Sequence, residues 1–185
     1  SLKRGHHTTV TGRSKPDDLE EGVDFLTLDF NPWPPTPPSE TDRSMLRLSL
    51  ASMNADILFW VAGHWLRRPL HMCTVEDLHK LYNVHLLGPT DLLATVMKLR
   101  TQALRTTPLH LVTIASSSAW KQRADGQAPY GAVQAAKVQF TRNLYAEASS
   151  LIEKTTIVRP GGMKTEFFDG SDVDTSEFMK TPEVA

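Results

Sequence analysis

The sequence predicts an α/β protein built on a parallel β-sheet. Along its 185 residues, short β-branched or apolar segments alternate with longer segments of helical periodicity. Two of the short segments, residues 56–62 and 109–114, are almost continuously apolar. Such runs are typical of strands buried on both faces, and they occur where helices cover both sides of a parallel sheet.

The strands are predicted from short runs that end at turn residues. Thr8 to Thr11 is a β-branched run closed by Gly12, which is typical of a strand followed by a turn. In chain order, the predicted strands are residues 8–11, 24–28, 56–62, 109–114 and 155–158.

The helices are predicted from apolar residues three or four positions apart. One helix begins after Thr74, which matches the capping-box pattern together with Asp77. The other predicted helices are residues 42–53, 91–104 and 130–151. Between Asn31 and Pro38, five prolines exclude both a helix and a central strand, so we expect a surface loop there.

The composition excludes several classes of protein. With 20 Lys and Arg against 21 Asp and Glu, the net charge of −1 is too balanced for a protein that binds a nucleic-acid backbone. Cys73 is the only cysteine, which excludes a disulfide scaffold. The longest apolar stretch is far shorter than the roughly 20 residues of a membrane helix, and no signal segment opens the chain. We therefore expect one cytoplasmic domain over residues 1–185, with neither a nucleic acid nor a membrane as partner.

Six short motifs follow one another in an order that is typical of one family. They are Thr11-Gly12-Arg13-Ser14, Asp29, Trp60-Val61-Ala62-Gly63, Asn83-Val84 with Gly88, Ala115-Ser116-Ser117-Ser118-Ala119 and Pro160-Gly161-Gly162-Met163-Lys164-Thr165. In this order they resemble the short-chain dehydrogenase/reductase family, which transfers hydride between NAD(P) and a carbonyl or alcohol. The resemblance implies a Rossmann-like, doubly wound parallel sheet in three αβα layers.

The spacing along the helix of residues 130–151 identifies its key tyrosine. In the family, a Tyr-x-x-x-Lys motif precedes Phe-Thr-Arg by a fixed distance, and Phe140 places that tyrosine at Tyr130. Ser117 then stands thirteen residues upstream, which is also the family spacing, and Gln134 takes the position of the lysine. An alternative register puts Lys137 in the lysine position. Val133 then replaces the tyrosine, and the spacings to Ser117 and to Phe140 no longer match those of the family.

The resemblance implies a role for each of these residues. Tyr130 is expected to be the acid/base, Ser117 the donor that positions the substrate oxygen, and Asn83 the anchor of a water relay. Gln134 can bond a cofactor ribose but carries no charge to favour the tyrosine phenolate. Lys137, two turns beyond Tyr130, would have to reach back more than one turn to compensate. The alternatives are that Tyr130 is only a buried tyrosine and that Asn83 only caps or kinks its helix.

The cofactor implied by the resemblance is NADP, with NAD also possible. Arg13, after the first strand, would contact the 2′-phosphate, although it could equally be a solvated surface arginine. The other cofactor contacts that the resemblance implies are Asp29, Ala62, Gly63, Pro160, Gly161 and Thr165. The substrate would be a small carbonyl or alcohol, and the helices near 74–104 and 130–151 would pair between copies in a homodimer or homotetramer. No metal site is predicted, since His79 and His85, six residues apart, do not share a helical face.

Two departures from the family pattern leave the function open. No glycine-rich loop that would cradle a pyrophosphate precedes the first predicted strand, and the family's last strand is not reached. We therefore expect a sheet without its first and last strands, in which the gap lies between the strands that end at Thr11 and Ala62. The first hypothesis is an NAD(P)-dependent oxidoreductase. The second, favoured by Gln134, Trp60 and Val61, is a catalytically weakened relative that binds a nucleotide or a protein partner.

Overall fold

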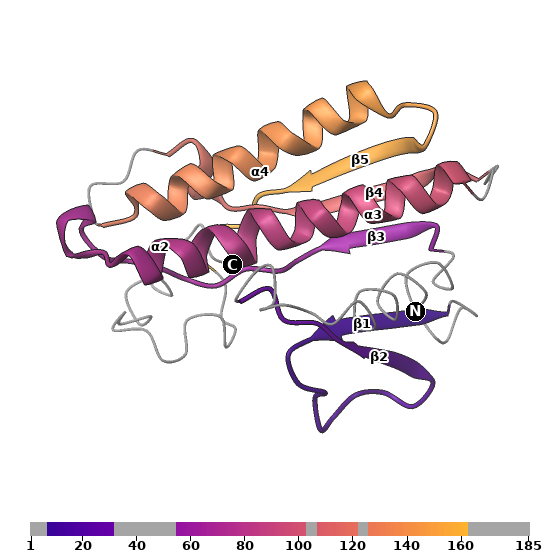
Figure 1. Ribbon diagram of the computed structural model, residues 1–185, viewed down its shortest axis with the longest axis horizontal. Coiled ribbons are helices and arrows are strands. Elements are labelled where there is room, and N and C mark those ends of the chain that lie inside the picture. Colours follow the sequence, from indigo (N-terminus) through magenta and orange to yellow (C-terminus); the bar gives the residue numbers. More distant parts are fainter. Residues whose placement is uncertain (1–6, 32–54, 103–106, 122–125, 163–185) are drawn as a thin grey trace. The chain divides into compact units, whose positions relative to one another are not determined.

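The computed structural model describes residues 7–31, 55–102, 107–121 and 126–162 (Figure 1). The predicted helix 42–53, the proline-rich loop beyond Asn31, and Thr165 lie outside the described residues. The chain divides into two compact units, Ser1–Asn54 and Ala55–Ala185.

The first unit contains a two-stranded parallel sheet. β1 (Thr8–Gly12) pairs with β2 (Val23–Thr27), and Thr8 lies opposite Val23 at the start of the register. Gly22, with φ of 83°, turns the chain into β2 in a conformation that favours glycine. Both strands were predicted from the sequence, and their parallel pairing is confirmed.

The second unit contains a three-stranded parallel sheet in the order β3-β4-β5. Its strands are β3 (Ile57–Trp60), β4 (Leu109–Ile114) and β5 (Ile152–Val158). Each strand was predicted within a few residues of its observed bounds. The sequence led us to expect a gap in the sheet between β1 and β3. Within the described residues, no strand pairs with both of these strands.

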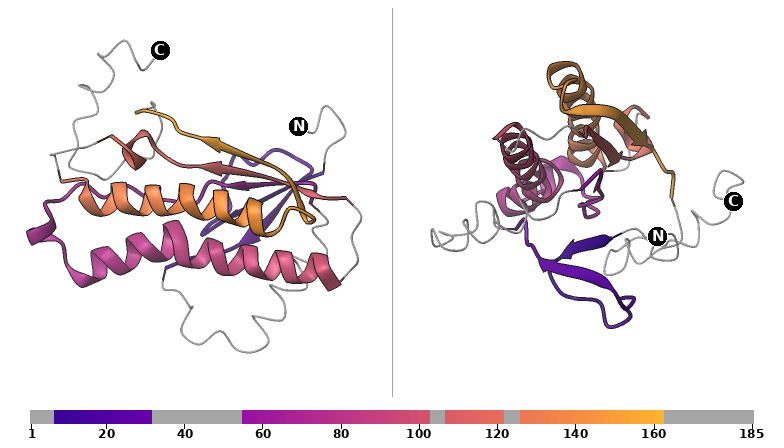
Figure 2. Two further views of the ribbon diagram at one scale, coloured as in Figure 1. Left: turned by 90° about the horizontal axis from the view of Figure 1, so that it is seen from above. Right: turned by 90° about the vertical axis from the view of Figure 1, so that its right-hand side faces the viewer.

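In the described part of the chain, three α-helices accompany this sheet. α2 (Val75–Tyr82) and α3 (Gly88–Gln102) lie end to end, joined by one π-helical turn, Asn83–Leu87. α4 (Ala128–Glu147) lies beside α3 on the same face of the sheet (Figures 1 and 2). None of the helices in the described segments has the length and apolar character needed to cross a membrane.

A hydrophobic core fills the space between the sheet and these helices. Its fully buried members are Trp60, Leu93, Leu111 and Ile152, and Phe140 and Leu144 of α4 pack against them. The rings of Trp60 and Phe140 meet edge to face at 5.8 Å. We call this group the sheet core.

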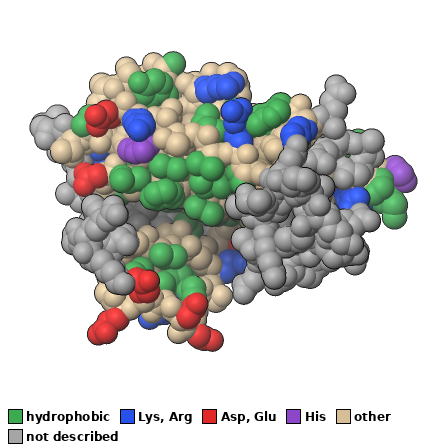
Figure 3. Space-filling view, turned by 180° about the vertical axis from the view of Figure 1, so that it is seen from behind, with side chains coloured by type: hydrophobic (Ala, Val, Ile, Leu, Met, Phe, Trp, Pro, Cys, Tyr) green, Lys and Arg blue, Asp and Glu red, His purple; other side chains and the backbone are tan. Residues whose placement is uncertain are grey.

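The other face of the sheet is not covered by any described helix. Ile57, Phe59 and Val61 alternate on β3 and just beyond it, and they are 51%, 62% and 63% exposed. Figure 3, which views the molecule from behind, shows hydrophobic side chains gathered at the surface there. The apolar character of β3 on both faces was therefore a correct sign of a parallel strand, and within the described residues a helical layer covers only one of these faces.

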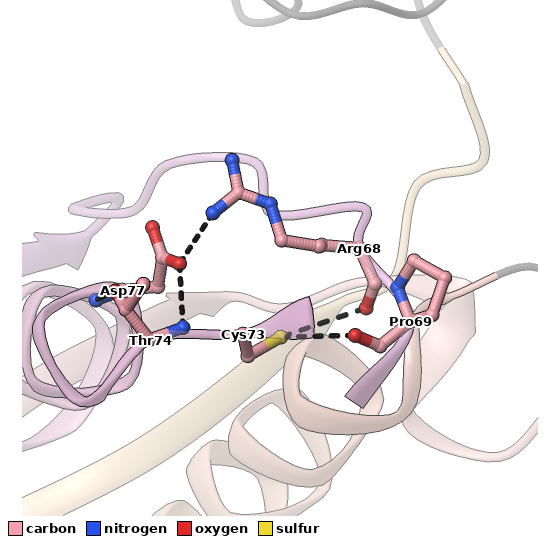
Figure 4. Close-up of polar contacts among 5 residues, drawn as sticks. All are labelled: Arg68, Pro69, Cys73, Thr74 and Asp77. Atoms are coloured by element: carbon pink, nitrogen blue, oxygen red, sulfur yellow. Dashed lines mark hydrogen bonds and ion pairs between the residues drawn. The ribbon is translucent and has the colours of Figure 1, made fainter. Parts of the chain in front are cut away.

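The start of α2 is held by a set of local polar contacts (Figure 4). The Thr74 hydroxyl accepts from the Asp77 N–H at 3.1 Å, and the Asp77 carboxylate accepts from the Thr74 N–H at 2.9 Å, which confirms the predicted capping box. Arg68 forms an ion pair with the same carboxylate. The hydrogen bonds from Thr74, followed by the charge of Arg68, hold the pKa of Asp77 below its usual value. The Cys73 thiol lies 3.6 Å from the carbonyl oxygens of Arg68 and Pro69.

A tight turn ties this region to the start of α4. Gly126 has a φ of 78°, and its carbonyl accepts from the Arg68 N–H at 2.8 Å. A Cβ at Gly126 would lie 2.9 Å from the carbonyl carbon of Arg68, so this close approach requires glycine. The turn therefore fixes where α4 begins. It thereby also fixes the position of Tyr130 in the first turn of this helix.

Candidate active site

The candidate site lies at the carboxyl ends of β3, β4 and β5. In a parallel sheet these ends meet at one edge, where ligands commonly bind. A short 3-10 turn, Ser117–Ala119, follows β4, and the Ser117 N–H donates to the Pro160 carbonyl at 3.1 Å. This bond joins the loop after β4 to the loop after β5. Two of the predicted motifs are thereby brought together.

Tyr130 lies in the first turn of α4 and is only 4% exposed. Its ring packs edge to face against Trp65 at 4.7 Å and His85 at 5.6 Å. Leu81 and Val133 complete its surroundings. Burial raises the pKa of the Tyr130 phenol, and hydrogen bonds from the side chains of Ser116 and Gln134 act in the opposite direction. The serine that influences the Tyr130 pKa is thus Ser116, and the role of Ser117 in positioning the substrate oxygen stays a prediction.

Gln134 lies one helical turn beyond Tyr130 and is 3% exposed. Its Nε2 atom is 3.1 Å from Nδ1 of His85. Its Oε1 atom is buried and has no hydrogen-bond partner among the described residues. A buried amide oxygen without a partner costs about 1–3 kcal/mol, so this atom is a site where a donor would be bound.

His85 comes from the π-helical turn between α2 and α3 and is 1% exposed. Its Nε2 atom is 2.7 Å from the carbonyl oxygen of His64 and 2.9 Å from the His64 nitrogen. Burial, followed by the charges of Lys137 and His64, lowers the pKa of His85 to about 3 against a hydrogen bond with the His64 backbone that raises it. The imidazole is therefore neutral at ordinary pH. Gly63 makes room for the ring, because a Cβ there would be 2.6 Å from its Cε1 atom.

Lys137 is buried on the same helix face but points to other partners. Its Nζ atom is 3.3 Å from the Ala62 carbonyl oxygen and 4.9 Å from the centre of the Trp60 ring. Burial lowers the pKa of the ammonium to about 7. The influences on the Tyr130 pKa are burial, Ser116 and Gln134, and Lys137 is not among them. The contacts of the Lys137 ammonium are therefore with Ala62 and Trp60.

The remaining predicted site residues are distributed over both units. Asn83 is 9% exposed at the end of α2, where its N–H bonds to carbonyls of the preceding turn and the π-helical turn begins. Gly161 is exposed, and no described atom lies within 4 Å of the position of a Cβ there. Arg13 and Asp29 are exposed residues of the first unit, and the Asp29 carboxylate accepts from the Asn31 N–H at 2.9 Å. The structure therefore brings Tyr130 and Gln134 together. It does not place Arg13 and Asp29 relative to them.

Sequence reasoning missed two residues of this site. Ser116 lies within the predicted Ser116-Ser117-Ser118 run, and only its contact with Tyr130 distinguishes it from its neighbours. His85 gave no usable signal, because its inward position depends on the π-helical turn, which shifts the helical periodicity. Within the described residues, no group of three or more His, Cys, Asp or Glu side chains is placed to hold a metal ion.

Comparisons with solved structures show the same fold in several dehydrogenases. A closed form of serine dehydrogenase complexed with NADP+ matches with a TM-score of 0.74 and 24% identity, over 97% of this chain and 74% of that one. Serine dehydrogenase from Escherichia coli matches with a TM-score of 0.69 and 24% identity, over 88% and 73%. A short-chain dehydrogenase from Sphingobium yanoikuyae in complex with NADPH matches with a TM-score of 0.68 and 22% identity, over 88% and 59%.

Sequence comparison places the chain in a family. No curated protein gives a significant match. The family model described as short chain dehydrogenase matches residues 36–175, which is about three quarters of the chain. That range includes the strand ends, Tyr130 and the loop after β5. The fold and the sequence agree, and the chain belongs to the short-chain dehydrogenase family.

Proposed function

We propose that the protein is an NADP-dependent oxidoreductase that interconverts a small carbonyl compound and its alcohol. The single observation that carries this proposal is the buried phenol of Tyr130 in the first turn of α4, beside the joined loops after β4 and β5. Membership in the short-chain dehydrogenase family supports the type of reaction.

The reaction requires a proton donor beside the reacting oxygen. Reduction of a carbonyl builds negative charge on that oxygen, so an acid must stand within about 3 Å of it. We assign this acid, and the base of the reverse reaction, to Tyr130. A serine hydroxyl would hold the substrate oxygen. Ser116, which bonds Tyr130, and Ser117, whose backbone is fixed by Pro160, are both candidates for this role. Asn83 remains our candidate for anchoring a water relay.

The residues around Tyr130 fit a nicotinamide nucleotide. When bound, the nicotinamide supplies or accepts the hydride. The unpartnered Oε1 of Gln134 would accept a ribose hydroxyl, and the open space at Gly161 would admit the ring. Among the other residues implied by the family resemblance, we assign cofactor contacts to Ala62, Gly63, Pro160, Thr165 and Asp29.

The preference for NADP rests on Arg13. A guanidinium forms bidentate bonds to a phosphate, and Arg13 directly follows a strand end, as a 2′-phosphate ligand would. Two of the structural neighbours are complexes with NADP+ or NADPH. We expect Arg13→Ala to weaken NADPH binding at least 10-fold and to leave NADH binding within 2-fold. Equal losses for both nucleotides would show that Arg13 does not distinguish them.

Turnover by Tyr130 is tested with NADPH and a panel of aldehydes and ketones. We expect the full chain to oxidise NADPH with at least one of them, and Tyr130→Phe to reduce the rate by 10²- to 10⁴-fold while NADPH binding is retained. Comparing Ser116→Ala with Ser117→Ala identifies the serine that holds the substrate oxygen, since its loss raises KM or lowers kcat more. A Tyr130→Phe variant with the wild-type rate would rule out the phenol as the acid.

A specific observation also favours a catalytically weakened relative. The Tyr130 pKa is raised by burial, and no cation is among the influences on it from the described part of the chain, where Gln134 stands in the position of the family's lysine. Such a protein would bind the nucleotide or a protein partner without turnover. NADPH binding without oxidation, unchanged in Tyr130→Phe, would support this second function. A gain of 10-fold or more in Gln134→Lys would support the first.

The assembly and location of the protein follow from the same resemblance. We propose a homodimer or homotetramer in the cytoplasm, in which the helices near 74–104, α2 and α3, and the helix near 130–151, α4, pair with their copies. Light scattering on the full chain tests this, and a monomer at micromolar concentration would contradict it.

A further inference from the structure

We propose that Arg159, held by Trp120, binds a carboxylate of the substrate, so that the carbonyl compounds reduced by this protein are short oxo acids. The inference rests on the proposed oxidoreductase function and adds to it the class of substrate. Neither residue has a role in the mechanism proposed above. Both lie at the carboxyl ends of the strands, Trp120 in the loop after β4 and Arg159 directly after β5.

The guanidinium of Arg159 is held in place without a charged partner. Its Cζ atom lies 4.1 Å from the centre of the Trp120 ring, over the face of the indole. Both side chains are exposed, that of Trp120 by 47%. Within the described residues, the guanidinium has no ion-pair or hydrogen-bond partner. A cation–π contact restrains the side chain and leaves N–H groups of the guanidinium able to donate to a ligand.

Two backbone hydrogen bonds fix Arg159 beside the loop that carries the predicted serines. The Val158 carbonyl accepts from the Ala115 N–H at 2.8 Å. The Pro160 carbonyl accepts from the Ser117 N–H at 3.1 Å. These bonds lie on either side of Arg159 in the sequence. Arg159 and Ser117, a candidate for holding the substrate oxygen, therefore belong to two loops that are bonded to each other.

The charge at this end of the sheet favours an anionic ligand. The described loops at the carboxyl ends of β3, β4 and β5 are residues 61–69, 115–121 and 159–162. They contain neither Asp nor Glu, and their Lys and Arg residues are Arg67, Arg68, Lys121 and Arg159. Arg68 is paired with Asp77 of α2. An excess of one sign of charge around a site raises the local concentration of ligands of the opposite sign.

The anion that fits Arg159 best is a carboxylate. A planar guanidinium presents parallel N–H groups that match the two oxygens of a carboxylate, and its single charge balances that of the anion. A guanidinium that is already restrained loses less freedom on binding. When Tyr130 and Ser117 hold the carbonyl oxygen of a short oxo acid, its carboxylate would be bound by Arg159 of the adjoining loop.

Binding of a carboxylate is tested without turnover. The probe is succinate, and succinamide is its neutral counterpart. The indole N–H signal of Trp120 in NMR, identified by its loss in Trp120→Phe, reports binding. We expect Arg159→Gln to weaken succinate binding at least about 10-fold. Arg159→Lys, which keeps the charge and loses the planar group, should weaken it by less.

The matched control is Lys121→Gln, which removes an exposed cation of the loop that carries Trp120 and should leave the affinity for succinate within about 2-fold. A loss in Lys121→Gln as large as that in Arg159→Gln would overturn the proposal, because the attraction would then come from a diffuse field. Succinamide binding as tightly as succinate would also overturn it. Both substituted side chains are exposed, so we expect the variants to fold, and their unfolding temperatures check this.

Selectivity is tested with NADPH and short oxo acids, each paired with its neutral amide. We expect the wild type to prefer the acids, and Arg159→Gln to lose this preference through a rise in KM for the acids of at least about 10-fold. An equal loss of NADPH affinity in Arg159→Gln would show that the guanidinium holds a phosphate of the cofactor, and would overturn the proposal.

The two tests distinguish the failure of this inference from the failure of the proposed function. If succinate binds as expected but no carbonyl compound is reduced, the proposed function fails and the carboxylate site at Arg159 stands. If carbonyl compounds are reduced without any preference for the acids, only the carboxylate site fails.

Discussion

The two halves of α4 bury their inner faces against different surroundings. The second half packs Phe140 and Leu144 onto the sheet core, and the buried hydroxyls of Thr113 on β4 and Thr141 on α4 bond each other at 2.9 Å. The first half packs Tyr130 and Val133 against Leu81, Trp65 and Leu66, which we call the site cluster. Beside the site cluster lies a neutral histidine and an amide oxygen without a partner.

The two clusters differ in how much apolar surface they bury. Burial of apolar side chains stabilises both clusters by about 25 cal/mol per Å². Each cluster also has a buried polar atom without a hydrogen-bond partner among the described residues, Nε1 of Trp60 in the sheet core and Oε1 of Gln134 beside the site cluster, and each such atom costs about 1–3 kcal/mol. The sheet core gathers more apolar side chains than the site cluster. It should therefore carry more of the folding free energy than the site cluster.

Truncating one leucine in each cluster tests this comparison with the largest expected effect. Leu111 in the sheet core and Leu81 in the site cluster are both fully buried. We expect Leu111→Ala to lower the free energy of unfolding by about 4 kcal/mol and Leu81→Ala by about 2–3 kcal/mol, because Leu111 lies on the central strand β4 between two neighbours that cannot close the cavity. Chemical denaturation of both variants measures the difference, and an equal or larger loss in Leu81→Ala would contradict the comparison.

Lys137 sits between the two clusters and provides a test through pH. Its ordinary pKa of 10.5 falls to about 7 on folding. Between these values the unfolded chain holds the proton and the folded chain does not, so raising the pH favours the folded state by up to about 1.4 kcal/mol per unit. We expect Lys137→Met to remove this rise and to be more stable than the wild type at pH 6, where a buried ammonium is most costly.

The control for this prediction is Lys154→Met, an exposed lysine on β5. It should leave the pH dependence between 7 and 10 unchanged. A slope that persists in Lys137→Met would mean that another group releases its proton on folding.

The sequence predicted what depends on local pattern. The strands, the capping box at Thr74 and the parallel fold follow from periodicity and turn chemistry, which act over a few residues. Tyr130 and Gln134 were found through their spacing from Phe140. Whether Ser116 or Ser117 bonds the phenol depends on how the chain turns after β4, and spacing along the sequence does not contain that information.

The burial of His85 and Lys137 was beyond sequence reasoning for a similar reason. His85 turns inward because a π-helical turn inserts one residue into the helical repeat. From the sequence, Lys137 could support Tyr130 only by reaching back more than one turn along its own helix. Instead its ammonium contacts the Trp60 ring at the end of β3 and the Ala62 carbonyl just beyond it, and both residues are far from Lys137 in the sequence.

The smallest effect is expected at the start of α2, which carries Leu81 into the site cluster. Thr74→Ala removes one side-chain bond of the capping box and should lower the free energy of unfolding by about 1 kcal/mol.

Because the Asp77 pKa is lowered by folding, the contribution of its carboxylate is present above the usual carboxyl pKa and is lost as the pH falls through the lowered value. In Thr74→Ala this acid-side loss should shrink, since the hydroxyl that anchors Asp77 is gone, whereas Thr101→Ala near the end of α3 should leave it unchanged. An unchanged acid profile in Thr74→Ala would show that the backbone N–H and Arg68 hold the carboxylate without the threonine hydroxyl.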